Sequence, residues 1–449
     1  MSQQTEPTRA ASLPSFDRDS AGRARLGRSV LADLFAPGQL STPAYVYDLT
    51  GIRAAAQALV EAFGEAPHLV AYAVKANTAG PVVRTIAAAG CGADVVSGGE
   101  LAVALGAGIP PQRIVMSGVA KLDGEIDAAL MAGPHGIAAI QLESVEEASR
   151  VAARARALGR RARVGLRLNP GVLVDTHVHV ATGHDEAKFG IPMADLGAAF
   201  EAIDAACELS LVGISSHVGS QLMETRGYLL AAERVCDVVA ARDAKGPIIE
   251  LVDFGGGFGI DYGGTSPLAP DVFARAALDL ARRRGLEGRT IVVEPGRSLV
   301  AAMGVLVARV IQTKRARSGD QGGERRWLMI DAGMNDLIRP ALYQAKHRIE
   351  PLDAPVPAGA RGIRVVGPVC ESSDDFGEHP MPESAPDLVV IRDAGAYGYT
   401  MASEYNGRAL PIEVFLDGDA APQVKRPRGV DAWVRERLEE PVARGDAGR

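Results

Sequence analysis

The chain has 449 residues, 47% of them hydrophobic and 23% charged, a composition typical of soluble globular proteins and long enough for two domains. Its net charge of −7 predicts no nucleic acid and no anionic membrane as a partner, and no apolar run approaches the ~18 residues of a membrane-spanning helix. The N-terminus lacks the apolar core of a secretory signal, and the four scattered cysteines, none in a CxxC pair, are typical of reduced thiols, so we expect a cytoplasmic protein without a metal site.

An alternation of strands and helices follows a polar start. Residues 1–24 are polar and aperiodic, and we expect them to be disordered. Strands are predicted at 68–77, 92–100, 113–121, 136–144, 161–170, 209–221, 249–259 and 290–297. Between them, apolar residues recur at helical spacing, and each strand is apolar almost throughout, which predicts a parallel sheet covered on both faces. These units fit a closed (β/α)8 barrel over residues 50–298, with a doubly wound open sheet as the alternative.

The pattern changes after the barrel. Residues 299–425 contain strands joined by loops rich in Pro, Gly and Asp, with few helices, which predicts a mainly antiparallel β domain. The segment 25–49, ending in "STPAYVYDL", is expected to add a strand to that domain. Residues 426–449 are mixed in charge and are expected to form a tail with a short helix.

Polar residues end several of the predicted barrel strands, where catalytic groups of such barrels gather. They are Lys75, Asp94, Arg167 with Asn169, His217 and Glu294. Taken singly, a histidine such as His217 is more often a core residue, and an acid such as Glu294 is more often salt-bridged. Lys75 must lose its proton to react with an aldehyde, and its position after an apolar strand predicts a pKa lowered by burial.

Glycine runs follow the last two barrel strands. In "DFGGGFG" (253–259) backbone amides can approach an anion, although a tight turn explains the run equally well, and it matches neither GxxxxGK[ST] nor GxGxxG. "EPGR" (294–297) adds a glycine and an arginine suited to an oxyanion. An amine, a phosphate cradle, an acid for a ring nitrogen and a flat group for a ring face together suit pyridoxal phosphate.

Eight motifs, in order from about residue 40 to 415, resemble those of the diaminopimelate decarboxylase family, pyridoxal-phosphate enzymes of the alanine-racemase-like barrel class. They are "YAVKAN", "ADVVSGGEL", "HVGSQ", "DFGGGFGIDY", "EPGR", "DAGMNDLIRPALYQAKH", "GPVCESSD" and "GAYGYTMASEYNGR". The resemblance implies decarboxylation of meso-2,6-diaminopimelate to L-lysine and CO2, the last step of lysine biosynthesis. It also implies a homodimer, in which each active site is completed by the partner subunit.

The same resemblance implies roles for individual residues. Lys75 would bind the cofactor covalently, His217 would stack on its ring, and Glu294 would pair with the ring nitrogen. The cofactor phosphate would be held by Ser220, Gly255, Gly256, Gly257, Gly296 and Tyr397, and Arg297 would be a further cofactor-binding residue. The substrate would be bound by Arg297, Arg339, Tyr343, Glu371, Ser372 and Tyr397, with Cys370 as the acid near its Cα.

Two positions depart from the family pattern: Ser215 replaces a histidine in "GISSHVGSQ", and Ser373 replaces a glycine in "CESSD". A bidentate donor such as Arg339 suits a second substrate carboxylate, which favours diaminopimelate, although a surface salt bridge is the alternative for this residue. The other functions considered are a decarboxylase for ornithine, lysine, arginine, carboxynorspermidine or a secondary-metabolite precursor, and a non-catalytic relative. A racemase is disfavoured because no second acid–base group is evident.

Overall fold

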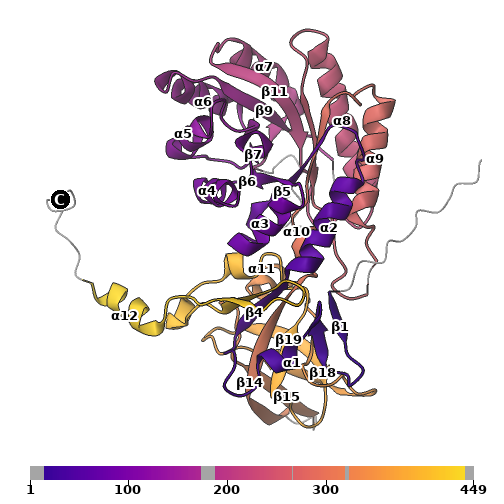
Figure 1. Ribbon diagram of the computed structural model, residues 1–449, viewed down its shortest axis with the longest axis vertical. Coiled ribbons are helices and arrows are strands. Elements are labelled where there is room, and N and C mark those ends of the chain that lie inside the picture. Colours follow the sequence, from indigo (N-terminus) through magenta and orange to yellow (C-terminus); the bar gives the residue numbers. More distant parts are fainter. Residues whose placement is uncertain (1–14, 173–187, 265, 319–322, 440–449) are drawn as a thin grey trace, which may run out of the picture. The chain divides into compact units, whose positions relative to one another are not determined.

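The computed structural model describes residues 15–172, 188–264, 266–318 and 323–439. Contacts within the chain divide it into two compact units, both visible in Figure 1. The first contains Asp48–Met303 and Gly395–Thr400, and the second contains Phe16–Tyr47, Gly304–Ala394 and the residues from Met401 onward. Within the described ranges, no helix has both the length and the apolar character needed to cross a membrane.

Eight parallel strands of the first unit close into a barrel. They follow the order β9, β11, β12, β13, β5, β6, β7 and β8, and β8 pairs with β9 again. Their bounds are β5 (His68–Ala73), β6 (Gly92–Val95), β7 (Ile114–Met116), β8 (Ala139–Leu142), β9 (Ala162–Asn169), β11 (Leu209–Ser216), β12 (Leu251–Gly256) and β13 (Thr290–Glu294). The short strand β10 (Ile191–Pro192) pairs with β9 in addition. The predicted (β/α)8 barrel is therefore confirmed, because the doubly wound alternative would leave two open edges.

Helices alternate with the barrel strands along the chain and surround them in Figure 1. They are α2 (Leu49–Glu61), α3 (Gly80–Ala88), α4 (Gly98–Gly106), α5 (Asp123–Met131), α6 (Val145–Ala157), α7 (Leu196–Asp204), α8 (Arg226–Asp243), α9 (Pro270–Arg283) and α10 (Arg297–Val300). Two begin at serine caps: Ser97 accepts from the Glu100 amide at 3.2 Å, and Ser144 accepts from the Glu147 amide at 3.2 Å. Such caps satisfy amides that a helix leaves without a partner, which explains why α4 and α6 begin there.

The barrel strands are shorter than the sequence predicts. The strand predicted over 68–77 ends at Ala73, and the next three residues form a 3₁₀ helix, η1 (Val74–Ala76). The other 3₁₀ helices are η2 (Pro111–Arg113), η3 (Met193–Asp195), η4 (Tyr399–Met401) and η5 (Tyr405–Gly407). Lys75 therefore lies in a 3₁₀ turn after β5 and not in the strand itself.

The second unit contains a mixed sheet of seven strands in one row, to which two further strands, β19 and β16, are added. The strands run in the order β18, β17, β15, β14, β4, β20 and β21, while β19 pairs with β14 and with β16. Their bounds are β4 (Ala44–Asp48), β14 (Gly304–Ser318), β15 (Gly323–Ile330), β16 (Ile349–Pro351), β17 (Arg361–Val366), β18 (Asp375–Met381), β19 (Leu388–Ile391), β20 (Ile412–Leu416) and β21 (Gln423–Lys425). β15 and β17 pair in parallel, and the other pairs with a described register are antiparallel, which confirms the predicted mainly antiparallel fold.

The prediction of disorder over 1–24 is wrong for the residues that follow Ser15, and residues 1–14 lie outside the described residues. A small antiparallel sheet forms from β1 (Phe16–Arg18), β2 (Ala24–Leu26) and β3 (Ser29–Val30), followed by α1 (Leu31–Leu34). Its apolar side chains lie in the core of the second unit, where Phe16 is 8% exposed and Leu26 is fully buried. The residues between Phe16 and Leu26 are mostly polar, so this short apolar pattern is not evident in the sequence.

Two further helices of the second unit are short. They are α11 (Arg339–Tyr343), which starts with the motif "RPALY", and α12 (Val430–Leu438), which lies in the predicted tail. Pro340 occupies the first turn of α11, where its missing amide costs no hydrogen bond. The end of the tail, residues 440–449, lies outside the described residues.

Candidate active site

Lys75 faces a buried carboxylate on the neighbouring barrel strand. Its Nζ lies 2.6 Å from Oδ2 of Asp94, whose strand β6 pairs with β5 so that Asp94 lies beside Ala73. The lysine side chain is 37% exposed, whereas that of Asp94 is 1% exposed. Oδ1 of Asp94 has no hydrogen-bond partner among the described residues. The pair thus combines an accessible amine with an acid that is largely removed from water.

The pKa of Lys75 is raised above its ordinary value, which corrects the expectation that burial would lower it. Burial does lower this pKa, but the negative charge of Asp94, with contributions from Tyr397 and Glu294, outweighs it. The sequence could not show this balance because Asp94 comes 19 residues later, and only the pairing of β5 with β6 brings the two groups together. The amine is therefore held in its protonated form.

His217, Glu294 and Asp253 form a second group: His217 follows β11, Glu294 ends β13, and Asp253 lies within β12. Nδ1 of His217 lies 3.5 Å from Oε2 of Glu294 and 3.3 Å from the amide nitrogen of Gly256. Burial raises the pKa of Glu294, but the hydrogen bond and charge of His217, together with the charges of Lys75 and Arg167, bring it down to about 2. Glu294 is therefore ionised at every physiological pH.

Asp253 behaves in the opposite way. Burial, and then the negative charge of Glu294, raise the pKa of this carboxyl well above its usual range, although it accepts a hydrogen bond from the Gly255 amide at 2.8 Å. Of two neighbouring buried acids, Glu294 carries the charge and Asp253 holds a proton. Asp253 was not predicted as a site residue, although it opens the "DFGGGFG" motif.

The glycine run has no room for side chains. Gly255 has φ +70°, and a Cβ there would lie 2.3 Å from the carbonyl oxygen of Ser216. Gly257 has φ +86°, and its Cβ would lie 2.1 Å from the carbonyl oxygen of Gly219. The amides of Gly255 and Gly256 donate to Asp253 and His217, so their binding of an anion stays a prediction. The turn itself places backbone close to the loop after β11.

A buried arginine, Arg297, contacts two of the other predicted cofactor-binding residues. Nη2 of Arg297 donates to Oγ of Ser220 at 2.9 Å, and its guanidinium lies over the ring of Tyr397 at 5.1 Å. Nη1 donates to the hydroxyl of Tyr262 at 2.7 Å. The Tyr397 amide donates to the carbonyl of Ala76 at 2.8 Å, which ties this cluster to the turn that holds Lys75. Tyr262 was not predicted, although it belongs to the quoted motif "DFGGGFGIDY".

Gly296 completes this cluster by close approach. A Cβ at this position would lie 3.1 Å from Cβ of Ala73, 3.3 Å from Cβ of Ala76 and 3.4 Å from the hydroxyl of Tyr397. A larger residue would therefore push against the turn of Lys75. The structure thus brings together Lys75, His217, Ser220, Gly255, Gly256, Gly257, Glu294, Gly296, Arg297 and Tyr397 in the barrel unit.

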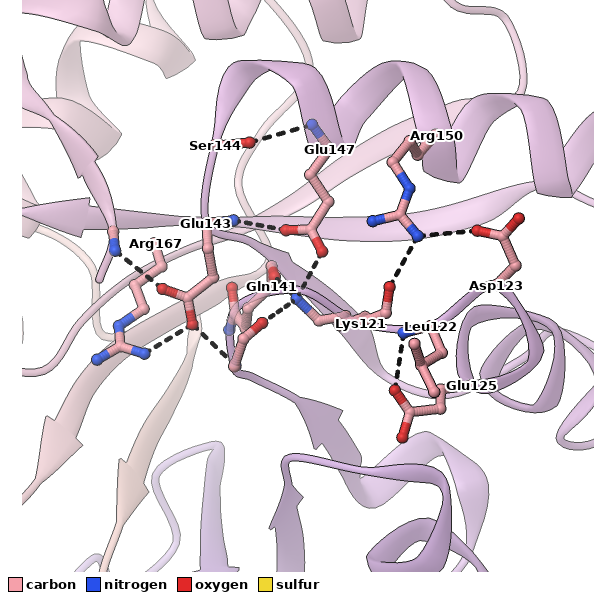
Figure 2. A network of polar contacts seen from close by, with 12 residues as sticks. Lys121, Leu122, Asp123, Glu125, Gln141, Glu143, Ser144, Glu147, Arg150 and Arg167 are labelled. Atoms are coloured by element: carbon pink, nitrogen blue, oxygen red, sulfur yellow. Dashed lines mark hydrogen bonds and ion pairs between the residues drawn. The ribbon is translucent and has the colours of Figure 1, made fainter. Parts of the chain in front are cut away.

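A separate polar network involves Arg167 and the loops after β7 and β8, as Figure 2 shows. Glu143 accepts from Arg167 at 2.7 Å and from the Gly118 amide at 2.8 Å. Nζ of Lys121 has three acceptors there, the carbonyls of Gly118 and Gln141 and the carboxylate of Glu147. Since the Lys121 side chain is only 1% exposed, this lysine is a structural one, and Lys75 remains the reactive candidate.

The remaining predicted site residues belong to the second unit. Arg339, 5% exposed, lies at the start of α11, and its Nη1 is 2.8 Å from Nε2 of His347. Tyr343 ends the same helix. Cys370 and Glu371 are exposed, and Ser372 and Ser373 follow them in the same exposed loop.

Three of the quoted motifs meet at that loop. The Cys370 amide donates to Oδ1 of Asn406 at 2.9 Å, and Oε1 of Glu371 accepts from the hydroxyl of Tyr405 at 2.6 Å. Asp374 accepts from the amides of Val369 and Met334, each at 2.6 Å. Asp374, Tyr405 and Asn406 were not predicted, because their role is to shape the loop rather than to supply a reactive group.

The residues of the barrel unit fit pyridoxal phosphate. The accessible amine of Lys75 suits its aldehyde, and a carboxylate that stays ionised, Glu294, suits a protonated ring nitrogen. Arg297 and Ser220 supply charge and a hydroxyl for a phosphate, beside backbone that only glycine can provide at positions 255 and 257. Each group that the cofactor needs is thus present within one barrel.

Comparisons with known proteins agree with this chemistry. The family model "Pyridoxal-dependent decarboxylase, pyridoxal binding domain" matches residues 49–301. Diaminopimelate decarboxylases of Zymomonas mobilis and of Neisseria meningitidis serogroup A are each 39% identical over 403 residues, covering 89% and 90% of this chain and 93% and 94% of theirs.

Solved structures give the same result. The diaminopimelate decarboxylase of Helicobacter pylori complexed with L-lysine has a TM-score of 0.82 and 36% identity, covering 90% of this chain and 98% of that one. The enzyme of M. jannaschii in co-complex with L-lysine has a TM-score of 0.84 and 32% identity, covering 95% and 98%. A lysine/ornithine decarboxylase of Vibrio vulnificus, at 23% identity and a TM-score of 0.69, shares the fold.

Proposed function

The chain belongs to the pyridoxal-dependent decarboxylase family, among its diaminopimelate decarboxylases, and on this premise we propose that it converts meso-2,6-diaminopimelate into L-lysine and CO2, the last step of lysine biosynthesis. In this reaction the bond between Cα and one carboxylate breaks, CO2 leaves, and a proton takes its place. The observation that carries the proposal is the accessible Lys75 amine 2.6 Å from buried Asp94, in a barrel that also holds the ionised Glu294. The scattered free cysteines support a cytoplasmic location.

Pyridoxal phosphate, when bound, supplies the electron sink for the electron pair left at Cα as CO2 departs. Lys75 would hold the cofactor covalently, His217 would lie against its ring, and Glu294 would keep the ring nitrogen protonated. The phosphate would be held by Ser220, Gly255, Gly256, Gly257, Gly296, Arg297 and Tyr397. The contacts of Arg297 with Ser220 and Tyr397 support this grouping.

Proton movement at Lys75 begins from the ion pair. The amine must lose its proton before it can react, and Oδ2 of Asp94 is the acceptor at hydrogen-bond distance. The raised pKa of Lys75 means that this proton is held firmly while Asp94 keeps its charge. Asp94 thus controls when the amine becomes neutral.

Substrate choice depends on the second unit. Arg339 presents a planar fork of donors that suits a carboxylate, and Glu371 presents a charge that suits an ammonium group. Only a substrate with both groups on its distal carbon, such as diaminopimelate, satisfies both residues, with Tyr343 and Ser372 beside them. Ornithine or arginine would instead bring a distal cation to Arg339.

The test is to incubate the purified chain and pyridoxal phosphate with each amino acid in turn. We expect L-lysine and CO2 from meso-diaminopimelate, and no amine from ornithine, lysine, arginine or carboxynorspermidine. A product from one of these four, with none from diaminopimelate, would move the chain to another decarboxylase. No product from any of them, in protein that binds the cofactor, would indicate a non-catalytic relative.

We further propose a homodimer in which Cys370 of one subunit donates the proton to Cα at the Lys75 site of the other. The exposure of Cys370 and Glu371 supports a role toward a second chain. Mixing the inactive variants Lys75→Ala and Cys370→Ala, with subunit exchange, should restore about a quarter of the wild-type activity, because about half of the dimers then contain one intact site. If the mixture stays inactive although the subunits exchange, each site is built from one chain.

A further inference from the structure

Arg339 is held from behind by a buried histidine. Nη1 of Arg339 lies 2.8 Å from Nε2 of His347, and the two side chains belong to residues that are 5% and 3% exposed. His347 stands eight residues after Arg339, at the end of the quoted motif "DAGMNDLIRPALYQAKH". His347 was not among the predicted site residues.

The other side of the imidazole ring determines which nitrogen carries the proton. Nδ1 of His347 lies 2.8 Å from the carbonyl oxygen of Arg392. A carbonyl can only accept, so Nδ1 must carry the hydrogen, and in the neutral ring Nε2 is then an acceptor. Arg339 can only donate, so the ring is matched to a guanidinium on one side and to a carbonyl on the other.

The backbone that supplies this carbonyl is itself well supported. Nη1 of Arg392 donates to Oε1 of Glu350 at 2.9 Å, and its guanidinium lies 4.3 Å from the ring centre of Phe16. Arg18 donates to the other carboxylate oxygen of Glu350 at 2.7 Å. Strand β1 (Phe16–Arg18) therefore supports the end of β19 at the position that orients His347.

We infer that His347 is a positioning residue, which fixes the guanidinium of Arg339 for a distal carboxylate and so selects substrates that carry one. The inference rests on the proposed function, because it assigns Arg339 to that carboxylate. An arginine side chain free to sample its rotamers loses much of that freedom on binding, whereas one already hydrogen-bonded to a buried ring does not. His347 therefore acts on the affinity for dicarboxylates, and the decarboxylation step itself does not depend on it.

Three variants of the holoenzyme test this inference. His347→Asn keeps an amide donor near Nδ1 but is too short to accept from Arg339, whereas His347→Gln can place its amide oxygen near the position of Nε2. His379→Asn is the matched control, since His379 is half-buried on β18 of the same unit, with Nε2 at 2.9 Å from the carbonyl of Phe376. For each variant, KM and kcat with meso-diaminopimelate, the calorimetric affinities for L-lysine and for cadaverine, and Tm are measured.

We expect His347→Asn to raise KM for meso-diaminopimelate about tenfold, the size expected for one hydrogen bond to a charged group. L-lysine, the product, keeps the distal carboxylate and lacks only the one at Cα, so its affinity should fall about as much. The kcat and the affinity for cadaverine, a diamine without a carboxylate, should stay within about twofold of wild type, a split that general destabilisation would not produce. His347→Gln should recover most of the loss, and His379→Asn should resemble wild type. If His347→Asn does not fold, His347→Leu takes its place, because it fills a similar volume without an acceptor.

Three results would overturn the inference: an unchanged KM in His347→Asn, an equal loss of affinity for cadaverine, or a Gln variant no better than the Asn variant. Failure of the proposed function is a separate result. It would appear as absent turnover of meso-diaminopimelate by the wild-type enzyme, and calorimetric binding of meso-diaminopimelate and cadaverine would then still compare the variants.

Discussion

Replacing Asp94 by asparagine should make Lys75 more reactive. At 2.6 Å and an effective dielectric constant of about 20, the attraction between the two charges is about 6 kcal/mol. Because the Lys75 side chain is 37% exposed, water screens this attraction, and we take about 2 kcal/mol as its effective size. Removing it lowers the pKa of Lys75, since burial then acts without its main opponent.

The expected result is a larger fraction of neutral amine at a fixed pH. A change of about 2 kcal/mol corresponds to about a thirtyfold increase in that fraction at pH 8, where the amine is mostly protonated in both proteins. The assay is brief acylation of the cofactor-free chain with an amine-selective reagent, followed by mass spectrometry. The labelling of Lys75 is divided by that of the exposed Lys245 in the same sample, which removes differences in reagent.

A control variant separates a local effect from a general loss of negative charge. Asp279→Asn removes the same charge from α9, where Asp279 forms an exposed ion pair with Arg282. It should leave the labelling ratio unchanged. The reasoning is refuted if Asp94→Asn, folded by its Tm, gives a ratio within about twofold of wild type, because Asp94 would then not hold the proton of Lys75.

Three other substitutions test separate parts of the structure. Glu294→Gln should lower kcat about a hundredfold or more with little change in KM, and the Glu294 pKa of about 2 predicts no acid limb from this group above pH 4. Gly255→Ala, whose Cβ would lie 2.3 Å from a carbonyl oxygen, should lose bound cofactor on dialysis as judged by absorbance, whereas Gly124→Ala, with no atom within 4 Å, should retain it. Burial raises the pKa of Asp336 to about 7, so its protonated form stabilises the fold at low pH and that stability is lost as pH rises from about 4 to 7. In Asp336→Asn, the fall in the free energy of urea unfolding between pH 5 and pH 8 should be smaller than in wild type.

The fold was predictable because each barrel strand carries its own signal. Apolar runs such as 290–297 and helices with recurring apolar positions repeat along the chain, and they need no knowledge of distant residues. The first residues of the second unit were not predictable in this way. Phe16 and Leu26 are buried there, but each belongs to a strand of only three residues. The arginines and aspartates around them are typical of a solvent-exposed segment.

The reactive residues could be identified from the sequence, but the neighbours with which they interact could not. Lys75 and Glu294 stand at strand ends, where a barrel concentrates reactive groups, so their positions were evident from the sequence. Their protonation depends on neighbours from other strands, namely Asp94 for the lysine and His217 for the glutamate. His347 could not be identified from the sequence for the same reason, because its proposed role depends on two hydrogen bonds that form only in the folded second unit.

The buried acids Glu294 and Asp253 differ in charge: Glu294 is ionised and Asp253 is protonated. This difference suits them to the proposed chemistry. Asp94 has a cationic partner in Lys75, and Glu294 lies beside His217, so each negative charge has a positive or polar neighbour. Asp253 has Glu294 as its main electrostatic neighbour, and its raised pKa keeps it neutral. A third charge at this position would compete for His217 and raise the pKa of Glu294, which would weaken the pairing with a protonated ring nitrogen that we propose for it. The proton on Asp253 therefore favours the ionised form of Glu294.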